Sequence, residues 1–365
     1  MKRNAAFRIA VLPGDGIGVE VMEAALTVLD AVSTRIGIGF AWERIVAGAK
    51  AYVETGTALS DEAMAAASSA DAILFGAMGM PDIRYPDGRE IAPQLDIREH
   101  LELYAGVRPI KSLPGLPLPL SDKRAASIDF VLIREQTEGL FAFRGEGVVE
   151  DDSSARDTML ITRKGSERVY DFAFRLARKR REAGLPGKVT CVDKANVLRS
   201  MAFSRKIFGE CAARNTDVAA DYCYIDAMAL NLVRQPWVYD VIVAENLFGD
   251  ILSDLGAALI GGMGVAPSGD IGDTHAMFQP CHGSAPDIAG TGKANPTAML
   301  LSAAMMLDWL AERHGVASCA DGARMIETAV ADAFAKDGMR PFEFGGRDGT
   351  AAITRTVLAR LDKAT

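Results

Sequence analysis

Strand-like and helix-like segments alternate along the first part of the chain, and this alternation restricts the possible fold more than any other feature. The apolar, strand-like runs of the whole chain lie at 7–12, 38–45, 71–75, 128–133, 188–193 and 238–244. Helix-like runs separate the first three, at 19–33 and 60–68. This alternation predicts an α/β fold with a parallel or mixed sheet and helices on its faces. Functional residues are then expected where the strands end.

The chain is long and apolar enough for a large core. It has 365 residues, of which 49% are hydrophobic and 24% charged, so two domains of ordinary size are possible. The longest apolar stretch, 298–310, is interrupted by Ser302 and Asp308, which predicts a buried helix and no membrane span. The N-terminal residues run directly into the strand-like segment 7–12, so no signal peptide is expected.

Cysteine usage and net charge narrow the function classes further. The five cysteines are scattered and form no C-x-x-C pair, which favours reduced thiols in a cytoplasmic protein: Cys191, Cys211, Cys223, Cys281 and Cys319. The formal charge of −8 argues against nucleic-acid binding. The basic residues between Arg175 and Arg181 have helical spacing and are interpreted as a solvated helix face.

Two irregular segments bear on domain organisation. The Pro- and Gly-rich loop Ser112–Pro119 is too short for a flexible interdomain linker. The charged segment Gly145–Arg168 contains the β-prone stretch Thr158–Thr162, which predicts either a projecting hairpin arm or an ordinary surface hairpin.

The first loop, Leu12–Gly18, lies between a predicted strand and a predicted helix. Its spacing is G-x-G-x-G, whereas the dinucleotide-binding motif requires G-x-G-x-x-G. Glycines still permit a ligand to approach the backbone closely. The alternative is a tight turn that binds nothing.

Three arginines and one lysine suit an anionic substrate. A guanidinium binds a carboxylate with two parallel hydrogen bonds, so Arg98, Arg108 and Arg134 would suit a dicarboxylate or tricarboxylate if they converge. Each alone is more typical of a surface ion pair. Lys194 ends a predicted strand, where partial burial would lower its pKa and let it accept a proton. The alternative is a structural lysine paired with a carboxylate.

Three aspartates give the strongest signal for chemistry. Asp250 and Asp254 are four residues apart, which places both carboxylates on one face of a helix. Their repulsion favours a cation between them, and oxygen ligands suit Mg²⁺ or Mn²⁺. Asp226, set among apolar neighbours, is a further candidate ligand. The alternative is that Asp250 caps the helix and Asp254 is solvated.

A loop near residue 285 is dense in Gly, Pro and hydrogen-bonding side chains. It runs from His282 to Gly290, and Asn295 follows. Such a loop suits an adenosine, with Asp287 accepting hydrogen bonds from the ribose hydroxyls. An acidic residue there would repel a 2′-phosphate and so favours NAD over NADP. His282 by itself is more typical of a structural histidine.

In this order, the motifs closely resemble the isocitrate/isopropylmalate dehydrogenase family of β-decarboxylating dehydrogenases, which includes tartrate/D-malate dehydrogenases. The most specific motif is Asn246–Asp254, followed by the glycine-rich 261–264. The resemblance implies an isopropylmalate dehydrogenase-like two-domain fold with a mixed, largely parallel sheet and helices on both faces. A discontinuous larger domain, 1–103 and 262–365, would carry the NAD-binding loops. The second domain, 104–261, would carry the substrate, metal and dimer contacts.

The resemblance also implies roles for individual residues. Arg98, Arg108 and Arg134 would hold the carboxylates of a substituted (R)-malate. Lys194 and Asp226 would be catalytic and reach in from the partner of a homodimer, and Asp226, Asp250 and Asp254 would bind Mg²⁺ or Mn²⁺. The residues expected at NAD are Ile17, His282, Gly283, Ser284, Ala285, Asp287, Ile288 and Asn295. NADP-dependent members usually have lysine and tyrosine in place of Asp287 and Ile288, so NAD is expected.

Two departures from the family pattern bear on the chemistry. Phe141 stands where the family usually has a tyrosine, whose phenol protonates the enolate after CO₂ leaves. Isopropylmalate enzymes usually have leucines at the positions of Gln94 and Leu95, and isocitrate enzymes a serine at Ala92. The expectation is therefore an NAD-dependent oxidative decarboxylation of a 3-isopropylmalate-type substrate. A tartrate/D-malate or isocitrate enzyme, or a weakened ligand-binding homologue, stays open.

Overall fold

The structure is a computed structural model that describes residues 6–363. The chain divides into two compact units. Unit 1 contains the described residues up to Leu101, the loop Leu113–Pro117 and the described residues from Gly261 onward. Unit 2 contains Glu102–Ser112 and Leu118–Ile260. Within residues 6–363, no helix has the length and apolar character needed to cross a membrane.

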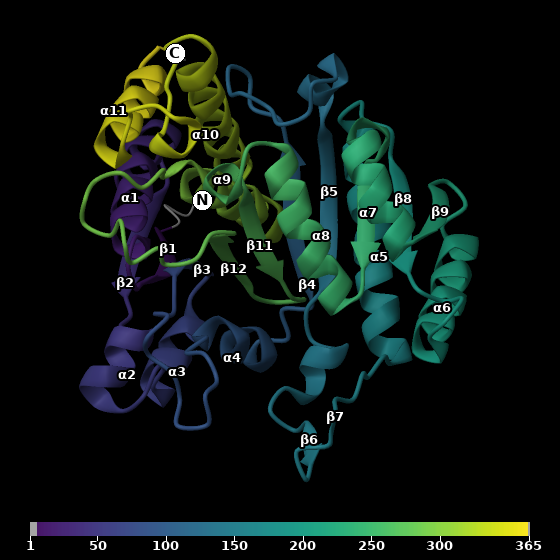
Figure 1. Ribbon diagram of the computed structural model, residues 1–365. Coiled ribbons are helices and arrows are strands. Elements are labelled where there is room, and N and C mark those ends of the chain that lie inside the picture. Colours follow the sequence, from purple (N-terminus) through teal and green to yellow (C-terminus); the bar gives the residue numbers. More distant parts are fainter. Residues whose placement is uncertain (1–5, 364–365) are drawn as a thin grey trace. The chain divides into compact units, whose positions relative to one another are not determined.

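Unit 1 is built on five strands with helices packed around them (Figure 1). In spatial order, its strands are β2 (Gly39–Arg44), β1 (Ala6–Gly14), β3 (Ala72–Ala77), β12 (Ala276–Pro280) and β11 (Pro267–Ile271). Their pairings are parallel, apart from the antiparallel pair β11–β12. Every residue of β3 is buried, which requires that both faces of the strand are covered.

The helices of unit 1 fall into two groups. The first packs together, with α1 and α9 against the strands: α1 (Gly18–Ile36), α9 (Thr297–His314), α10 (Ala317–Ala335) and α11 (Thr350–Leu361). The second contains the shorter helices α2 (Ala49–Thr55), α3 (Asp61–Ser69) and α4 (Pro93–His100). The predicted buried helix at 298–310 is confirmed as the centre of α9.

Unit 2 repeats this plan with a second set of five strands. In spatial order they are β4 (Ala105–Lys111), β5 (Asp129–Glu135), β10 (Val241–Ala244), β8 (Lys188–Asp193) and β9 (Ala219–Tyr224). Only β4–β5 is antiparallel among these described pairings. Two helix pairs accompany the strands: α5 (Arg163–Glu182) with α6 (Arg199–Arg214), and α7 (Ile225–Arg234) with α8 (Asn246–Leu259). The predicted α/β fold with a mixed, mostly parallel sheet is confirmed.

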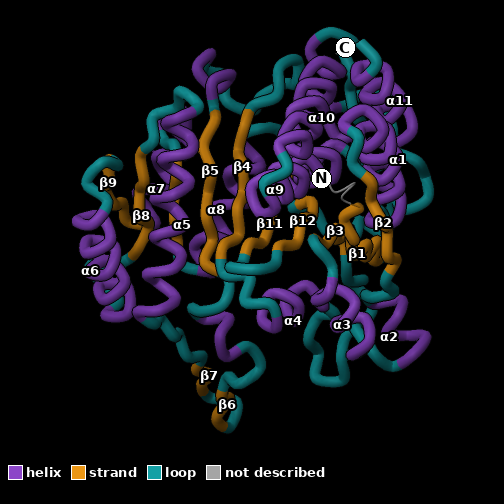
Figure 2. The backbone as a smooth tube through the Cα atoms, turned by 180° about the vertical axis from the view of Figure 1, so that it is seen from behind, coloured by secondary structure: helices purple, strands orange, loops and turns teal. Residues whose placement is uncertain are grey.

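A hairpin of two short strands, β6 (Val148–Glu150) and β7 (Ser154–Arg156), extends away from the other elements of unit 2 in both views of the backbone (Figures 1 and 2). The predicted hairpin within 145–168 is thus confirmed and takes the form of a projecting arm. Its strands precede the β-prone stretch Thr158–Thr162, in which only Leu160 forms a β-bridge, with Gly139.

Two expectations about local structure hold only in part. The strand expected from Val238 begins at Val241, because Pro236–Val238 forms a 3-10 turn. Of the basic residues of α5, Arg175, Lys179 and Arg181 are exposed as expected, but Arg180 is not. The Arg180 side chain is only 12% exposed, and its Nε donates to Asp240 Oδ1 at 2.5 Å. The pairing acid lies 60 residues away in the sequence, where helical periodicity gives no sign of it.

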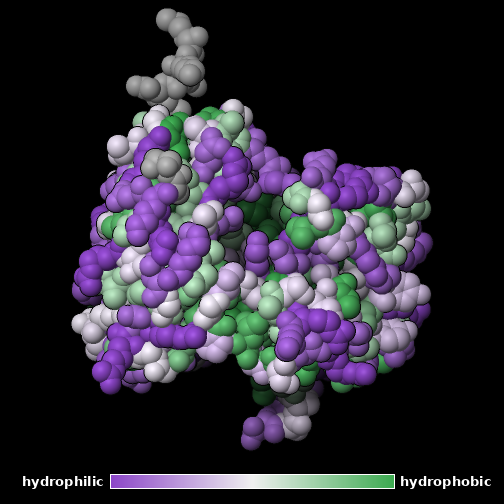
Figure 3. Space-filling view, turned by 90° about the horizontal axis from the view of Figure 1, so that it is seen from above, coloured by the Kyte–Doolittle hydropathy of each residue, from purple (hydrophilic) through white to green (hydrophobic). Residues whose placement is uncertain are grey.

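Hydrophilic side chains cover most of the molecular face seen in Figure 3, with small apolar patches between them. Some large apolar side chains are nevertheless exposed on the α7–α8 pair of unit 2. Leu230 and Val233 of α7 are 55% and 49% exposed, and Ile251 of α8 is 57% exposed.

Candidate active site

Helix α8 carries the two aspartates expected to bind a metal. Glu245 caps its first turn, where the carboxylate accepts hydrogen bonds from the backbone N–H groups of Leu247 (3.1 Å) and Phe248 (3.3 Å). Asp250 therefore does not cap the helix. A Cβ atom at Gly249 would lie 2.7 Å from Cβ of Arg134, so glycine permits the close approach of α8 to β5. The predicted helical spacing of Asp250 and Asp254 is confirmed.

Two carboxylates and two guanidinium groups interact electrostatically around α8. Arg134 is buried, its Nε donates to Asn246 Oδ1 at 2.9 Å, and its Nη1 forms an ion pair with Asp250. Partial burial, followed by the negative charge of Asp250, raises the pKa of Asp254, while Arg108 and Arg134 lower it in part. Two carboxylates that repel one another on one helix face fit the oxygen donor set of Mg²⁺ or Mn²⁺.

Arg108 and Arg134 lie on the paired strands β4 and β5. Arg108 is opposite Leu132, and Arg134 is opposite Gly106. Because alternate residues share a face, the two arginines occupy diagonal positions on the same face of this strand pair. Both are buried, and both act electrostatically on Asp254. Unit 2 thus places two of the three predicted carboxylate-binding arginines beside the predicted metal site.

Lys194 and Asp226 form a separate pair in unit 2. Lys194 follows β8, Asp226 lies in the first turn of α7, and Lys194 Nζ is 2.5 Å from Asp226 Oδ1. The hydrogen bond from Lys194 lowers the pKa of the Asp226 carboxyl. Among residues 6–363, no three His, Cys, Asp or Glu side chains are grouped so that they could hold a metal ion. Within one chain, then, Asp226 does not join Asp250 and Asp254.

Phe141 belongs to a short turn, Leu140–Phe143, that is fastened to the start of α8. The guanidinium carbon of Arg134 lies 5.2 Å from the centre of the Phe141 ring, and Asn246 Nδ2 donates to the carbonyl of Glu138 at 2.9 Å. Glu245 also accepts a hydrogen bond from the backbone of Leu140. The turn and the helix that carries the predicted metal ligands are therefore connected.

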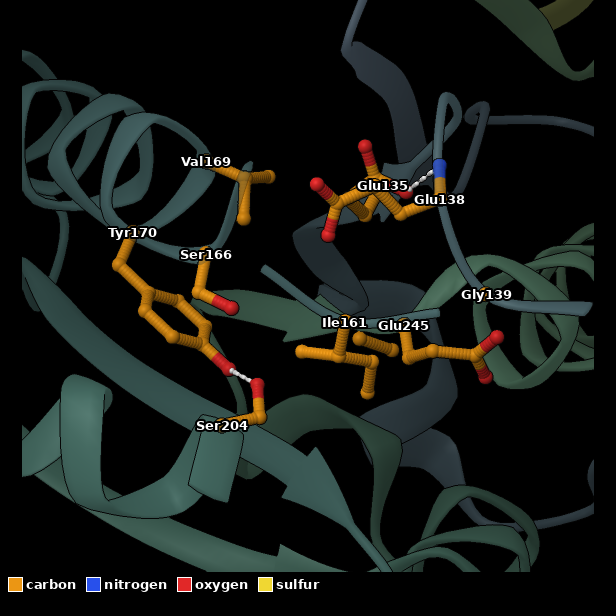
Figure 4. A pocket seen from close by; sticks show the side chains of 10 residues that line it. Glu135, Glu138, Gly139, Ile161, Ser166, Val169, Tyr170, Ser204 and Glu245 are labelled. Atoms are coloured by element: carbon orange, nitrogen blue, oxygen red, sulfur yellow. Dashed lines mark hydrogen bonds between the residues drawn. The ribbon is translucent and has the colours of Figure 1, made fainter. Parts of the chain in front are cut away.

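A small cavity of about 20 Å³, room for a water molecule, lies beside this turn (Figure 4). Three glutamates, Glu135, Glu138 and Glu245, line it together with Tyr170 and the hydroxyls of two serines. Burial raises the pKa of Glu135 and of Glu245. None of the predicted site residues lines this cavity, so it is distinct from the predicted substrate site.

In unit 1, helix α4 carries the residues expected near the variable part of the substrate. Gln94 and Arg98 are four apart and Leu95 lies between them, so all three are within one turn of each other. Arg98 is only 7% exposed. Its Nε donates to Asp270 Oδ2 at 2.8 Å.

The loops expected to bind the cofactor are joined within unit 1 by direct hydrogen bonds. The Ile17 N–H donates to the Ser284 carbonyl at 2.7 Å, and Ser284 Oγ donates to the Gly79 carbonyl at 2.5 Å. Gly16 has a φ of +54°, and a Cβ there would lie 2.0 Å from the Ser284 oxygen. Glycine is therefore required for this loop contact.

The buried side chain of Asp15 also connects these loops. It is 4% exposed, and its carboxylate accepts hydrogen bonds from the backbone N–H groups of Ala49 (2.7 Å), Lys50 (3.0 Å) and Gly79 (2.9 Å). One side chain thus joins the loop after β1, the start of α2 and the loop after β3.

The second cofactor loop contains a buried atom that fits a ligand. Burial lowers the pKa of His282, and its Nε2 makes no hydrogen bond within the described chain. Asp287 and Gly283 are exposed, and Ala285 and Ile288 are half-buried. Asn295 supports α9, because its Oδ1 accepts hydrogen bonds from the N–H and hydroxyl of Thr297. An exposed carboxylate and an unpaired imidazole nitrogen suit a nucleoside.

Sequence reasoning missed four side chains that orient the site: Asp15, Glu245, Asp270 and Gln279. Asp15 lies within the quoted loop Leu12–Gly18, and Glu245 directly precedes the Asn246–Asp254 motif. An acidic residue before a helix is a recognisable cap signal. Asp270 carries no local signal, since its partner Arg98 is 172 residues away. Gln279 donates from Nε2 to Asp270 Oδ2, a contact made between the paired strands β11 and β12.

Comparison with known proteins extends over nearly the whole chain. A family model described as isocitrate/isopropylmalate dehydrogenase matches residues 8–357. The chain is 41% identical to a 3-isopropylmalate/3-methylmalate dehydrogenase of Methanocaldococcus jannaschii, covering 97% of this chain and 98% of that protein. It is 43% identical to a 3-isopropylmalate dehydrogenase of Aquifex aeolicus, with coverage of 83% and 84%.

Two solved structures have the same architecture. Isocitrate dehydrogenase from Methylococcus capsulatus matches with a TM-score of 0.85 at 36% identity, covering 97% of this chain and 99% of that one. A β-decarboxylating dehydrogenase from Thermococcus kodakarensis, in its apo form, matches with a TM-score of 0.79 at 38% identity, covering 98% and 96%.

Proposed function

Because this chain belongs to the isocitrate/isopropylmalate dehydrogenase family, we propose that it catalyses the NAD-dependent oxidative decarboxylation of 3-isopropylmalate. The structural observation that carries the proposal is the group formed by Asp250, Asp254, Arg108 and Arg134 in unit 2, where two carboxylates face two buried guanidinium groups. The names of the similar enzymes from Methanocaldococcus jannaschii and Aquifex aeolicus support an isopropylmalate-type substrate over tartrate or isocitrate.

The arginines would bind and orient the substrate. Arg108 and Arg134 share one face of the β4–β5 pair and would hold malate carboxylates there. Arg98 would bind a carboxylate from unit 1, and Gln94 and Leu95 on the same helix would contact the substituent. Buried guanidinium groups bind a carboxylate strongly because little water competes for it.

Lys194 and Asp226 would handle the proton of the substrate hydroxyl. Lys194 accepts that proton when its amine is neutral, and Asp226, at 2.5 Å, orients the amine. Once the hydroxyl carbon is oxidised to a ketone, the carboxylate on the neighbouring carbon is β to that ketone. The bond between this carbon and its carboxylate breaks, CO₂ leaves, and the bonding electrons form an enolate. Phe141 carries no acidic proton, so water would protonate the resulting enolate.

The residues present fit the divalent metal ion and the NAD that the proposed reaction requires. Asp250 and Asp254 would hold Mg²⁺ or Mn²⁺, and the loops around Ile17, Ser284 and His282 would hold NAD, with Asp287 and Ile288 near the adenosine ribose. When bound, the metal would polarise the substrate oxygens and NAD would accept the hydride. The exposed carboxylate of Asp287 favours NAD over a cofactor that carries a 2′-phosphate.

A homodimer would complete the site. Asp226 pairs with Lys194 and lies apart from Asp250 and Asp254, so a second chain would have to supply the third metal ligand and the base. The exposed apolar residues Leu230, Val233 and Ile251 on α7 and α8 offer a surface for that second chain. Free cysteines throughout the chain support a cytoplasmic location.

The test is NADH formation with purified enzyme, Mn²⁺ and a panel of (R)-malates: 3-isopropylmalate, D-malate, tartrate and isocitrate. We expect the highest kcat/KM with 3-isopropylmalate, complete loss of activity in EDTA, and recovery with Mn²⁺ or Mg²⁺. Asp250→Asn should weaken Mn²⁺ binding strongly, since it removes a ligand. It relieves the repulsion of Asp254 but also removes the charge that pairs with Arg134, so the two effects on fold stability oppose one another. Full activity in EDTA would refute the metal assignment, and preference for another malate would reassign the substrate.

A further inference from the structure

A buried polar network in unit 1 contacts the guanidinium of Arg98 at its Nε atom. Asp270, on β11, is fully buried, and one of its oxygens, Oδ2, accepts hydrogen bonds from Arg98 Nε (2.8 Å) and from Gln279 Nε2 (2.7 Å). The Arg98 side chain is 9% exposed. An ionised pair is therefore enclosed in the core of unit 1 together with a neutral amide that fixes the carboxylate.

The strand pairing holds this carboxylate in place. In the antiparallel pair β11–β12, Gln279 lies opposite Ser268, two residues before Asp270, so Asp270 and Gln279 lie diagonally on one face. The main-chain carbonyl of Gln279 accepts hydrogen bonds from Ser268 Oγ and Ser302 Oγ, both at 2.8 Å. Ser302 belongs to α9, so the network is anchored to a helix as well as to two strands.

Stability alone does not explain why the chain keeps this network. A buried ion pair is often no more stable than apolar residues of similar volume, because both charges lose their hydration. A guanidinium has five N–H groups, and Asp270 engages the one on Nε. The two Nη groups of Arg98 make no hydrogen bond with the described residues. A buried cation with unused donors is prepared for an anionic ligand.

We propose that Asp270, held by Gln279, is a positioning residue that fixes the orientation of Arg98 so that its two Nη groups face the substrate carboxylate. This inference rests on the proposed function, in which Arg98 binds that carboxylate. Bidentate binding depends on orientation as well as on charge, because both N–H groups must point at the two carboxylate oxygens together. A guanidinium free to rotate would keep its charge and lose this geometry.

The first test is Asp270→Asn, which keeps the volume and removes the charge that fixes Nε. We expect KM for 3-isopropylmalate to rise at least tenfold, while KM for NAD stays within twofold and kcat within threefold. Gln279→Leu leaves the Arg98–Asp270 pair intact and only loosens the carboxylate, so a smaller rise, about threefold, is expected. Arg98→Lys should resemble Asp270→Asn, since lysine keeps the charge without the fork.

Unit 2 offers a matched control. Arg180 Nε donates to Asp240 Oδ1 at 2.5 Å, and the two side chains are 12% and 1% exposed. Asp240→Asn breaks a pair of the same kind at a similar depth, and neither Asp240 nor Arg180 is a predicted site residue. We expect Asp240→Asn to lower the thermal midpoint as Asp270→Asn does, and to leave both KM values unchanged.

A structural role alone would give unchanged substrate KM in Asp270→Asn, or an equal rise in Asp240→Asn, and either result would overturn the inference. If Asp270→Asn does not fold, an unchanged KM in Gln279→Leu would overturn it instead. Thermal-shift titration with 3-isopropylmalate, D-malate and isocitrate gives a readout independent of turnover, in which Asp270→Asn should need at least tenfold more ligand. Absence of turnover in the parent enzyme would refute the proposed function and leave this binding comparison decisive for Asp270.

Discussion

Replacing Asp15 with asparagine probes how the cofactor loops are held. The carboxylate lies 4% exposed and receives three backbone N–H groups from two other segments. Asparagine has nearly the same shape but only one acceptor oxygen. If that oxygen replaces Oδ2, it keeps the bonds from Ala49 and Gly79, and the new amide NH₂ group then faces the Lys50 N–H.

The magnitude follows from the bonds that change. Hydrogen bonds to a charged group contribute about 1.5–3 kcal/mol and neutral ones about 0.5–1.5 kcal/mol, so two retained bonds each weaken by about 1 kcal/mol. The third N–H, that of Lys50, is partly buried and loses its acceptor, which costs a further ~1–3 kcal/mol. Asp15→Asn should therefore lower the free energy of unfolding of unit 1 by about 3–5 kcal/mol. For a unit of roughly 200 residues, this corresponds to a lower melting midpoint by about 10 °C.

Thermal melts followed by tryptophan fluorescence suit this measurement, because Trp42 and Trp309 both belong to unit 1. We also expect KM for NAD to rise about tenfold or more, since a shift of 1 Å in a positioned group has effects of this order or larger. Asp82→Asn is the control, as Asp82 is an exposed aspartate in the same unit. A melting midpoint within 1 °C of the parent, with unchanged KM for NAD, would refute the reasoning.

Three further predictions concern cofactor choice, protonation and pH. Asp287→Lys should shift the kcat/KM ratio of NADP to NAD at least tenfold toward NADP, because a cation replaces the exposed carboxylate; an unchanged ratio would place Asp287 away from the ribose. Phe141→Tyr should raise kcat if protonation limits turnover, since a positioned acid contributes roughly 10²–10⁴-fold to such a step, and the parent's solvent isotope effect should disappear. A slower variant with an unchanged isotope effect would assign Phe141 to the substrate pocket. Burial raises the pKa of Glu135 above 4.5, so ionisation of this side chain destabilises the folded state. The destabilisation is absent below pH 4.5, where Glu135 is protonated in both states, and is complete above the folded-state pKa. Urea titrations should therefore show the parent gaining stability relative to Glu135→Gln as pH falls from 7 to 5, and parallel pH profiles would contradict this.

The elements of the fold were predictable where apolar residues repeat with a simple period. The run Lys188–Asp193 coincides with β8, and the helix-like run 60–68 corresponds to α3, whose N-cap is Ser60. The ends of strands were informative too, since Lys194 directly follows β8 and Arg134 lies near the end of β5. These patterns are local, so the residues that form them lie within a few positions of one another.

The orientation of the site residues was not predictable in the same way. Asp15 reaches Lys50 and Gly79 across 35 and 64 residues, and Arg98 meets Asp270 across 172. The sequence does not distinguish a buried aspartate from a solvated one, and no periodic pattern indicates which distant residue it pairs with. Arg180 shows the opposite error, since a residue interpreted as solvated is only 12% exposed and pairs with Asp240. Family resemblance predicted roles for the residues expected to contact ligands. It did not predict the residues, such as Asp15 and Asp270, that hydrogen-bond to those residues or to their loops.

The turn that carries Phe141 is held by contacts that do not depend on the side chain at position 141. Asn246 accepts from Arg134 and donates to Glu138, so a single amide aligns the arginine, the turn and the start of α8. None of these contacts involves an oxygen at position 141, where the phenyl ring lies 5.2 Å from the Arg134 guanidinium. These contacts therefore orient the proposed metal ligand Asp250 and Arg134 whether residue 141 is phenylalanine or tyrosine. In the proposed reaction, substrate binding and hydride transfer would use these residues, whereas protonation of the enolate would use an acid at position 141 or water. Phe141→Tyr should therefore change only the last step.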